Sequence, residues 1–139
     1  MAEAVFRDML LKENLTEKIE ADSGGIGGWH VGKMPHHGTR KILDKQNISY
    51  EGMRARQVSK KDWENFNYII AMDDQNIKDL QKINSQNEIV VAKLMDFVEE
   101  INEQEVPDPY YTGNFDYTFE LVTEGCSNFL SYIRDEHNI

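Results

Sequence analysis

The sequence predicts an α/β fold in three layers, with a doubly wound parallel sheet between two layers of helices. Segments with helical periodicity alternate with short apolar runs and loops along the chain, an order typical of parallel sheets. Two of these runs, 68–72 and 89–92, are apolar throughout their length, as strands buried on both faces are. A long amphipathic helix is expected at 115–137, where apolar side chains recur every three or four residues.

The first half of the chain is expected to contain one helix, one strand and a glycine-rich loop before two shorter helices. The apolar face of the first helix consists of Ala2, Val5, Phe6, Met9 and Leu10. A short strand is expected at 18–23, and a loop follows at 24–28 because glycine relaxes the backbone. Thr39 is predicted to cap the first of these shorter helices, which runs through Lys45. Ser59 is predicted to cap the second, which ends near Phe66.

In the second half, Asp73 is predicted to cap a helix at 76–83. A loop is expected at 106–113, because two prolines within it restrict the backbone. The apolar stripe of the last helix consists of Phe115, Thr118, Phe119, Val122, Cys126, Phe129, Leu130 and Ile133. Cys126 lies within that stripe, so we interpret it as a buried core residue.

Three predicted strands are few for a doubly wound sheet, which usually has four or more. The chain also opens on a helix whose apolar face needs a sheet to pack against. Both features lead us to expect that a strand of the complete fold lies outside these residues.

Composition limits the classes of function. Residues 1–139 fit one domain, and a formal net charge of −10 argues against general nucleic-acid binding, which needs a basic surface. No stretch is long and apolar enough for a membrane span, and the first residues do not have the pattern of a signal peptide. A single cysteine allows no internal disulfide. We therefore expect a cytoplasmic protein.

The sharpest local signal is Asp108, which stands between Pro107 and Pro109 and is followed by Tyr110 and Tyr111. A carboxylate fixed on a loop is a candidate general acid. The alternative interpretation is a capped turn with surface tyrosines.

Several segments of the chain resemble the low-molecular-weight protein tyrosine phosphatases, in the same order as in that family. The resemblance covers the whole chain. The segments that carry it are Met1-Ala2-Glu3-Ala4-Val5-Phe6, Asp22-Ser23-Gly24, Gly28-Trp29-His30-Val31-Gly32, Arg54-Ala55-Arg56-Gln57-Val58, Tyr68-Ile69-Ile70-Ala71-Met72-Asp73 and Asp108-Pro109-Tyr110-Tyr111.

The resemblance implies hydrolysis of phosphotyrosine through a phosphocysteine. In the family, a Cys-x5-Arg loop precedes the segment that matches Met1, and it supplies the nucleophile and the phosphate-binding arginine. These 139 residues contain no Cys-x5-Arg, since Tyr132 stands where Cys126 would need its arginine. We therefore expect a chain truncated at its N-terminus, without the central first strand and the phosphate loop, that folds with low stability and is catalytically inactive by itself.

The resemblance also implies roles for individual residues. Asp108 matches the general acid. The other matches are the substrate-binding rim of Trp29, Tyr110 and Tyr111, and the loop-supporting residues Ser23 and Asp73. The implied partner is a phosphotyrosine-containing protein or a small aryl phosphate, and no cofactor or metal is implied.

Three alternatives are weaker. A non-catalytic remnant or a phospho-ligand-binding module would keep only the rim of the pocket. Arsenate reduction on a related fold relays a disulfide among several cysteines, and this chain has one. A metal site at His30, His36 and His37 has close spacing in its favour but no suitable carboxylate or cysteine nearby.

Overall fold

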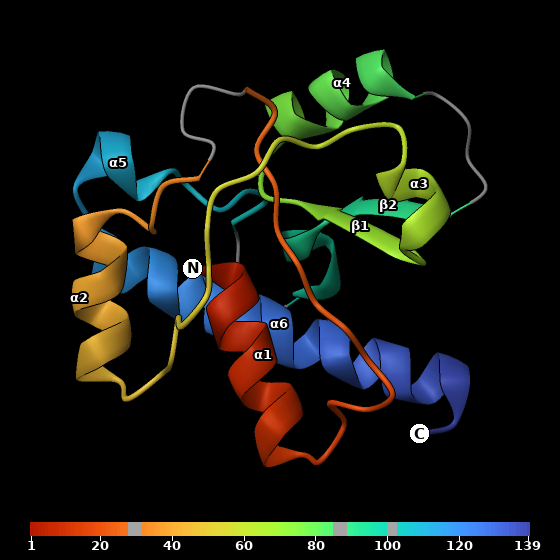
Figure 1. Cartoon of the computed structure of the whole chain (residues 1–139), viewed down its shortest axis with the longest axis horizontal. Helices are drawn as coiled ribbons and strands as arrows, with labels where there is room; N and C mark the ends of the chain where they lie inside the picture. Colours follow the sequence, from red (N-terminus) through yellow and green to blue (C-terminus); the bar gives the residue numbers. More distant parts are fainter. Residues whose placement is uncertain (28–31, 85–88, 100–102) are drawn as a thin grey trace.

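The computed structural model describes residues 1–27, 32–84, 89–99 and 103–139, and their helices and strands form three layers (Figure 1). In chain order, the elements are α1 (Ala2–Lys12), α2 (His37–Lys45), α3 (Asp62–Asn65), β1 (Tyr68–Ala71), α4 (Asp74–Ile83), β2 (Val90–Lys93), the 3-10 helix η1 (Leu94–Phe97), α5 (Pro109–Thr112) and α6 (Phe115–His137).

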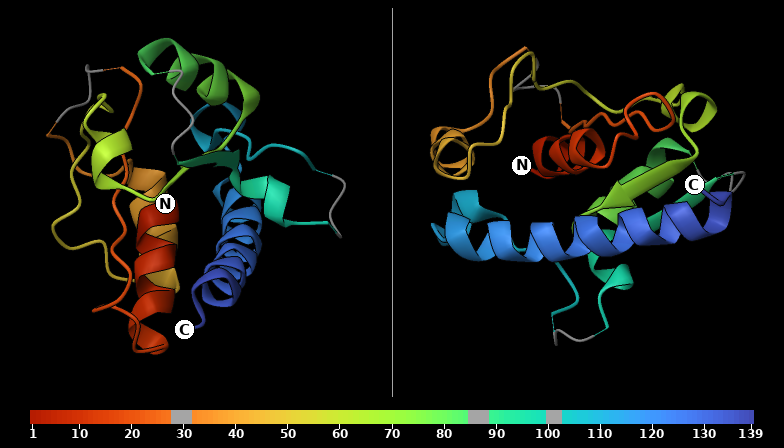
Figure 2. Two further views of the ribbon diagram at one scale, coloured as in Figure 1. Left: turned by 90° about the vertical axis from the view of Figure 1, so that its right-hand side faces the viewer. Right: turned by 90° about the horizontal axis from the view of Figure 1, so that it is seen from below.

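The middle layer is a parallel pair of strands, in which β1 and β2 run in register from Tyr68 opposite Val90 to Ala71 opposite Lys93. Helices α1 and α6 lie on one side of the pair, and α4 lies on the other (Figures 1 and 2). The larger core cluster combines α1 and α6 with η1, and the smaller cluster joins Trp63 and Leu80 to Ala71. Helices on both sides of a parallel sheet are the arrangement that the order of elements predicts.

The strand predicted at 18–23 is wrong, because the described residues form a two-stranded sheet of β1 and β2 only. Residues 19–24 have no assigned secondary structure and run as a drawn-out trace (Figure 1), and a single parallel bridge between Gly25 and Gln57 follows them. A strand requires a hydrogen-bonded neighbour, and a cavity lies between this segment and β1. For the same reason β1 is not buried on both faces: Tyr68 to Ile70 are only half-buried.

The predicted caps had mixed outcomes. Asp73 caps α4 as predicted, accepting a hydrogen bond of 2.7 Å from the backbone N–H of Asn76. Thr39 is instead a buried residue inside α2, and His36 caps that helix by accepting from the N–H of Gly38 at 3.1 Å. Ser59 does not cap α3 either; its N–H donates to the Asp62 carboxylate at 2.9 Å.

Helix α6 follows its predicted bounds, and its buried residues repeat every three or four positions. Cys126 is 2% exposed, which confirms that it is a core residue. None of the helices in the described part of the chain combines the length and apolar character that a bilayer span requires.

Burial raises the pKa of the Cys126 thiol to about 12, from 9.0 for a free thiol. The folded chain therefore keeps a proton that the unfolded chain loses above pH 9, so the free energy of unfolding should fall as pH rises through this range. We expect a loss of about 1.4 kcal/mol per pH unit at most, measured by urea unfolding at increasing pH. In Cys126→Ala, the part of the pH dependence that comes from the thiol should be absent. Identical pH profiles for the two chains would contradict the raised pKa of Cys126.

Candidate active site

A cavity of about 1040 Å³ lies between segment 18–26, β1 and the helices α1 and α6, and we call it the central cavity. Four of the six residues predicted for the site border it: Ser23, Asp73, Asp108 and Tyr110. Tyr111 does not border it and is 84% exposed, and Trp29 lies outside the described residues. The fold thus brings together residues that are far apart in the sequence.

The loop that carries Asp108 is held from two sides. The N–H of Val106 donates to the carbonyl of Met72, just beyond β1, at 2.9 Å. On the other side, the buried hydroxyl of Thr118 on α6 shares its proton between the carbonyl of Pro107 at 3.3 Å and that of Asn114 at 3.2 Å. These two bonds fix the backbone immediately before Asp108 relative to the sheet and to α6.

Asp108 is the N-cap of α5, so the segment predicted as a loop contains one helical turn. The prolines do not prevent it, because Pro109 occupies the first helical position, where no N–H is needed. The Asp108 Oδ1 atom accepts from the N–H of Tyr110 at 2.9 Å. Among the described contacts, Oδ2 has no hydrogen-bond partner, so the exposed carboxylate keeps one oxygen available.

The aromatic residues beside Asp108 form a connected group. The His36 ring stacks on Phe115 with centroids 5.4 Å apart and meets Tyr110 edge-on at 5.5 Å. Tyr111 contacts Tyr110 edge-on at 5.3 Å. The hypothesis of a metal site did not predict that His36 borders the central cavity and contacts the ring of Tyr110. Its place after Pro35 and before a helix is the available signal in the sequence.

Ser23 and Asp73 already have partners in the structure. The Ser23 hydroxyl donates to Glu3 at 2.6 Å, and Glu3 also pairs with Arg7 at 3.0 Å. The Asp73 carboxylate caps α4 through Asn76. Both residues border the central cavity.

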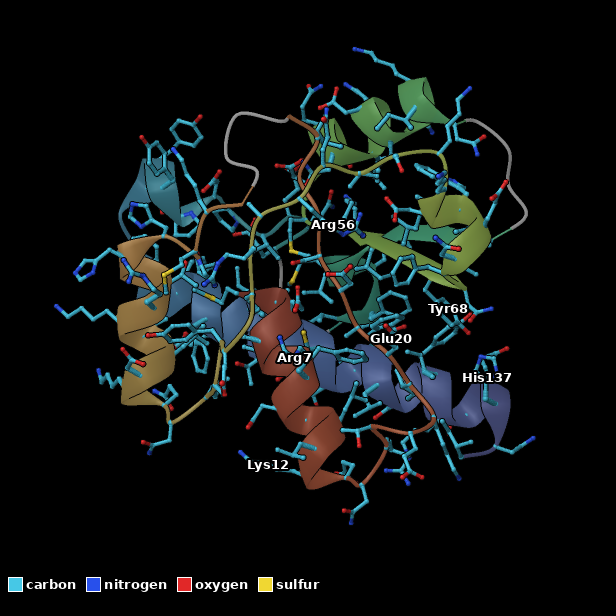
Figure 3. All side chains as sticks on the ribbon, viewed as in Figure 1. Arg7, Lys12, Glu20, Arg56, Tyr68 and His137 are labelled. Carbon is cyan, nitrogen blue, oxygen red and sulfur yellow. The ribbon has the colours of Figure 1, made fainter. Side chains whose placement is uncertain are left out.

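Arg56 is the sole arginine among the described residues that line the central cavity, and two carboxylates hold it. Its guanidinium bonds Asp22 at 2.9 Å and Asp62 at 3.1 Å. The hydrogen bond to Asp62 is the main cause that raises the Arg56 pKa. Figure 3 shows Arg56 well apart from Tyr68 and His137, which border the cavity near the start of β1. Because Arg56 is already paired, it is a poor candidate for binding phosphate.

In the described part of the chain, no three histidine, cysteine or acidic side chains are grouped so that they could hold a metal ion. His30 lies outside the described residues. His36 is engaged with Gly38 and two aromatic rings instead.

The fold and the position of Asp108 place this chain among α/β proteins whose sites lie beyond the carboxyl ends of parallel strands. Residues 1–138 match the family model described as low molecular weight phosphotyrosine protein phosphatase. The chain therefore belongs to the low-molecular-weight protein tyrosine phosphatase family, a family of hydrolases.

Bacterial relatives match the chain over its full length. It is 49% identical over 140 residues to low molecular weight protein-tyrosine-phosphatase YfkJ of Bacillus subtilis, covering 100% of this chain and 90% of that protein. It is 40% identical to PtpA of Staphylococcus epidermidis, with coverage of 100% and 88%.

Solved structures agree with this assignment. The crystal structure of YfkJ matches with a TM-score of 0.95 and 49% identity, over 98% of this chain and 86% of that chain. A protein tyrosine phosphatase from Entamoeba histolytica matches with a TM-score of 0.88 and 30% identity, over 97% and 88%.

Proposed function

We propose that this chain carries the acid and the substrate-binding rim of a phosphotyrosine phosphatase site, with Asp108 as the general acid. The observation that carries the proposal is the fixed position of Asp108 at the border of the central cavity, with one carboxylate oxygen unpartnered among the described contacts. A general acid must be held within reach of the atom that it protonates, and the anchored loop satisfies that requirement.

The substrate is a phosphotyrosine-containing protein or a small aryl phosphate. Tyr110 is 67% exposed and is supported by His36, so it offers a flat surface to an aromatic ring. Trp29 and Tyr111 complete this rim in the proposal. YfkJ and PtpA are both named as protein-tyrosine-phosphatases, which supports the same substrate class.

We propose that none of these 139 residues is the nucleophile. Cys126 is 2% exposed, its pKa is raised to about 12, and Tyr132 stands at the position of the required arginine. We therefore propose that the chain by itself is catalytically inactive, and that activity needs an apolar strand followed by a Cys-x5-Arg loop. Ser23 and Asp73 would then support that loop.

The proposed reaction has two steps. The loop thiolate forms a bond to phosphorus while the bond from phosphorus to the phenolic oxygen breaks, and Asp108 gives its proton to that oxygen. Water then attacks the phosphocysteine and gives a proton back to Asp108, which releases inorganic phosphate and the thiolate. Chemistry that depends on a free thiolate suits a reducing, cytoplasmic compartment.

The test compares two proteins with p-nitrophenyl phosphate as substrate. One is the 139-residue chain, and the other, which we call the extended chain, has an apolar strand and a Cys-x5-Arg loop joined ahead of Met1. We expect hydrolysis by the extended chain and none above background by the 139 residues.

The matched control is the extended chain with its loop cysteine replaced by serine, which should be inactive because the thiolate is absent. Hydrolysis by the 139-residue chain would overturn the proposed inactivity. An inactive extended chain that is folded would overturn the proposed phosphatase function.

A further inference from the structure

Charged residues of opposite sign are segregated along the sequence. Residues 23–43 and 52–61, which we call the basic segments, contain seven of the 15 lysines and arginines and none of the 25 acidic residues. Residues 94–133, which we call the acidic segment, contain nine acidic residues and no lysine or arginine. A surface between two such regions has a positive potential on one side and a negative potential on the other.

The basic segments and the acidic segment meet at the central cavity. Among the residues that line it, Ser23 and His36 come from the basic segments, and Asp108 and Tyr110 come from the acidic segment. His36 and Tyr110 are in edge-on contact at 5.5 Å, where α2 and α5 lie side by side (Figures 1 and 2). The candidate site therefore lies between regions of opposite charge.

Two exposed cations of the basic segments, Lys33 and Arg54, lie beside the site. The N–H of Ala55 donates to the carbonyl of Lys33 at 2.8 Å, so the segments that carry the two cations run next to each other. Both cations border a smaller cavity of about 200 Å³, which shares Ser23 with the central cavity. Lys33 also comes three residues before His36, which contacts the predicted rim at Tyr110.

Neither Lys33 nor Arg54 has a carboxylate partner among the described contacts. The guanidinium of Arg54 donates instead to the carbonyl of Met53, at 2.7 Å. Both cations therefore keep a charge that an anionic group of a ligand can neutralise. Other arginines of the chain are already paired with carboxylates, at 2.9 to 3.1 Å: Arg7, Arg56 and Arg134.

We propose that the site selects phosphotyrosine peptides by the order of the charges that flank the phosphotyrosine. Acidic residues on one side of it bind Lys33 and Arg54, and basic residues on the other side face the acidic segment, where Glu103 and Glu105 precede Asp108. A peptide with the reverse order meets like charges on both sides, which lowers its affinity. The proposal names a substrate class for the proposed phosphatase and rests on that function for the phosphotyrosine itself.

The test uses two labelled phosphotyrosine peptides of identical composition and net charge. One has two glutamates before the phosphotyrosine and two lysines after it, and the other has the reverse order. Fluorescence anisotropy measures the affinity of each peptide for the extended chain with its loop cysteine replaced by serine. Because the two peptides have the same net charge, a difference in affinity reports the positions of the charges and not a general attraction to the chain.

We expect the two dissociation constants to differ at least about fivefold at low salt, the effect of two exposed ion pairs. The ratio should approach one at 1 M salt, where the Debye length is about 3 Å. The 139-residue chain should prefer the same peptide, because it contains both charged regions. Equal affinities of the extended chain for the two peptides at low salt, or no binding of either, would overturn the proposal.

A pair of double variants of the extended chain locates the cations. Lys33→Glu with Arg54→Glu should bring the ratio of dissociation constants to one or invert it. The matched control is Lys78→Glu with Lys82→Glu, which changes the net charge equally at exposed positions of α4, outside both charged regions, and should keep the ratio.

Both peptides are compared on the same protein, so the ratio does not depend on how much of a variant is folded. If the charge reversal prevents folding, Lys33→Gln with Arg54→Gln removes the two charges without adding new ones, and the ratio should then approach one. A ratio that these substitutions leave unchanged would also overturn the proposal.

The outcomes separate this proposal from the proposed phosphatase function, because p-nitrophenyl phosphate has no flanking residues. Hydrolysis of that substrate with equal affinities for the two peptides would remove the charge selection and keep the phosphatase function. An affinity that depends on charge order, in an extended chain that is folded but inactive, would do the reverse.

Discussion

Replacing Asp108 by asparagine in the extended chain is expected to lower kcat for p-nitrophenyl phosphate by about 10² to 10⁴. Asparagine keeps the size of the side chain and can still accept the hydrogen bond from the Tyr110 N–H, so the start of α5 should be preserved. It has no proton to give to the departing phenolate. The loss should therefore appear in the chemical step, and an assay of p-nitrophenol release measures it.

The leaving group distinguishes an acid from a merely structural residue. Unsubstituted phenolate is more basic than p-nitrophenolate and depends more on protonation, so Asp108→Asn should slow phenyl phosphate hydrolysis more than p-nitrophenyl phosphate hydrolysis. Asp116→Asn, an exposed carboxylate nearby on α6, is the matched control and should leave both rates unchanged. Equal losses for the two substrates would show that Asp108 acts by holding the loop.

Sequence patterns predicted the elements whose signals are local. Helix α6 has its predicted bounds, because its apolar repeat spans 23 residues and Asn114 offers a capping side chain at its start. The cap at Asp73 is also a local signal, because the N–H that its carboxylate binds belongs to Asn76, only three positions along the chain. Such signals need no knowledge of the rest of the fold.

The errors come from interactions with distant parts of the chain. Segment 18–23 was predicted as a strand, but a strand forms only where another segment pairs with it, and a cavity lies beside it instead. Thr39 has a good capping side chain, yet it faces the core of the folded chain while His36 caps α2. Propensity is a weak guide where tertiary packing decides.

The candidate site was predicted in part. The two prolines pointed to Asp108, and the structure puts Asp108 at the cavity. The supports of its loop were not predicted, because the bonds to Met72 and Thr118 join residues that are 34 and 11 positions apart. The roles of Trp29, Tyr111, Ser23 and Asp73 stay predictions.

Replacing Gly125 by valine is expected to destabilise the fold by about 3 kcal/mol, near the upper end of the usual overpacking cost. A Cβ atom at this position would lie 2.5 Å from Cγ of Leu94 and 2.8 Å from its Cδ2. Leu94 is 2% exposed, so its side chain has no route into solvent. Urea unfolding of the extended chain measures the change.

Gly125→Ala tests which of two opposing effects is larger. Alanine within a helix is favoured over glycine by about 1 kcal/mol, whereas overpacking costs about 1–3 kcal/mol. The contact is with a branch carbon of Leu94, not with the end of a flexible side chain, so we expect net destabilisation. Ser127→Ala, at an exposed position of the same helix, should have little effect.

The central cavity makes this cost depend on what occupies it. Leu94 borders the cavity, so in the 139-residue chain its side chain has room to move away from a new Cβ at position 125. A strand in the cavity removes that room. Gly125→Ala should therefore cost less in the 139-residue chain than in the extended chain. If Gly125→Ala instead stabilises both chains, the Leu94 side chain moves away from the new Cβ without entering the cavity.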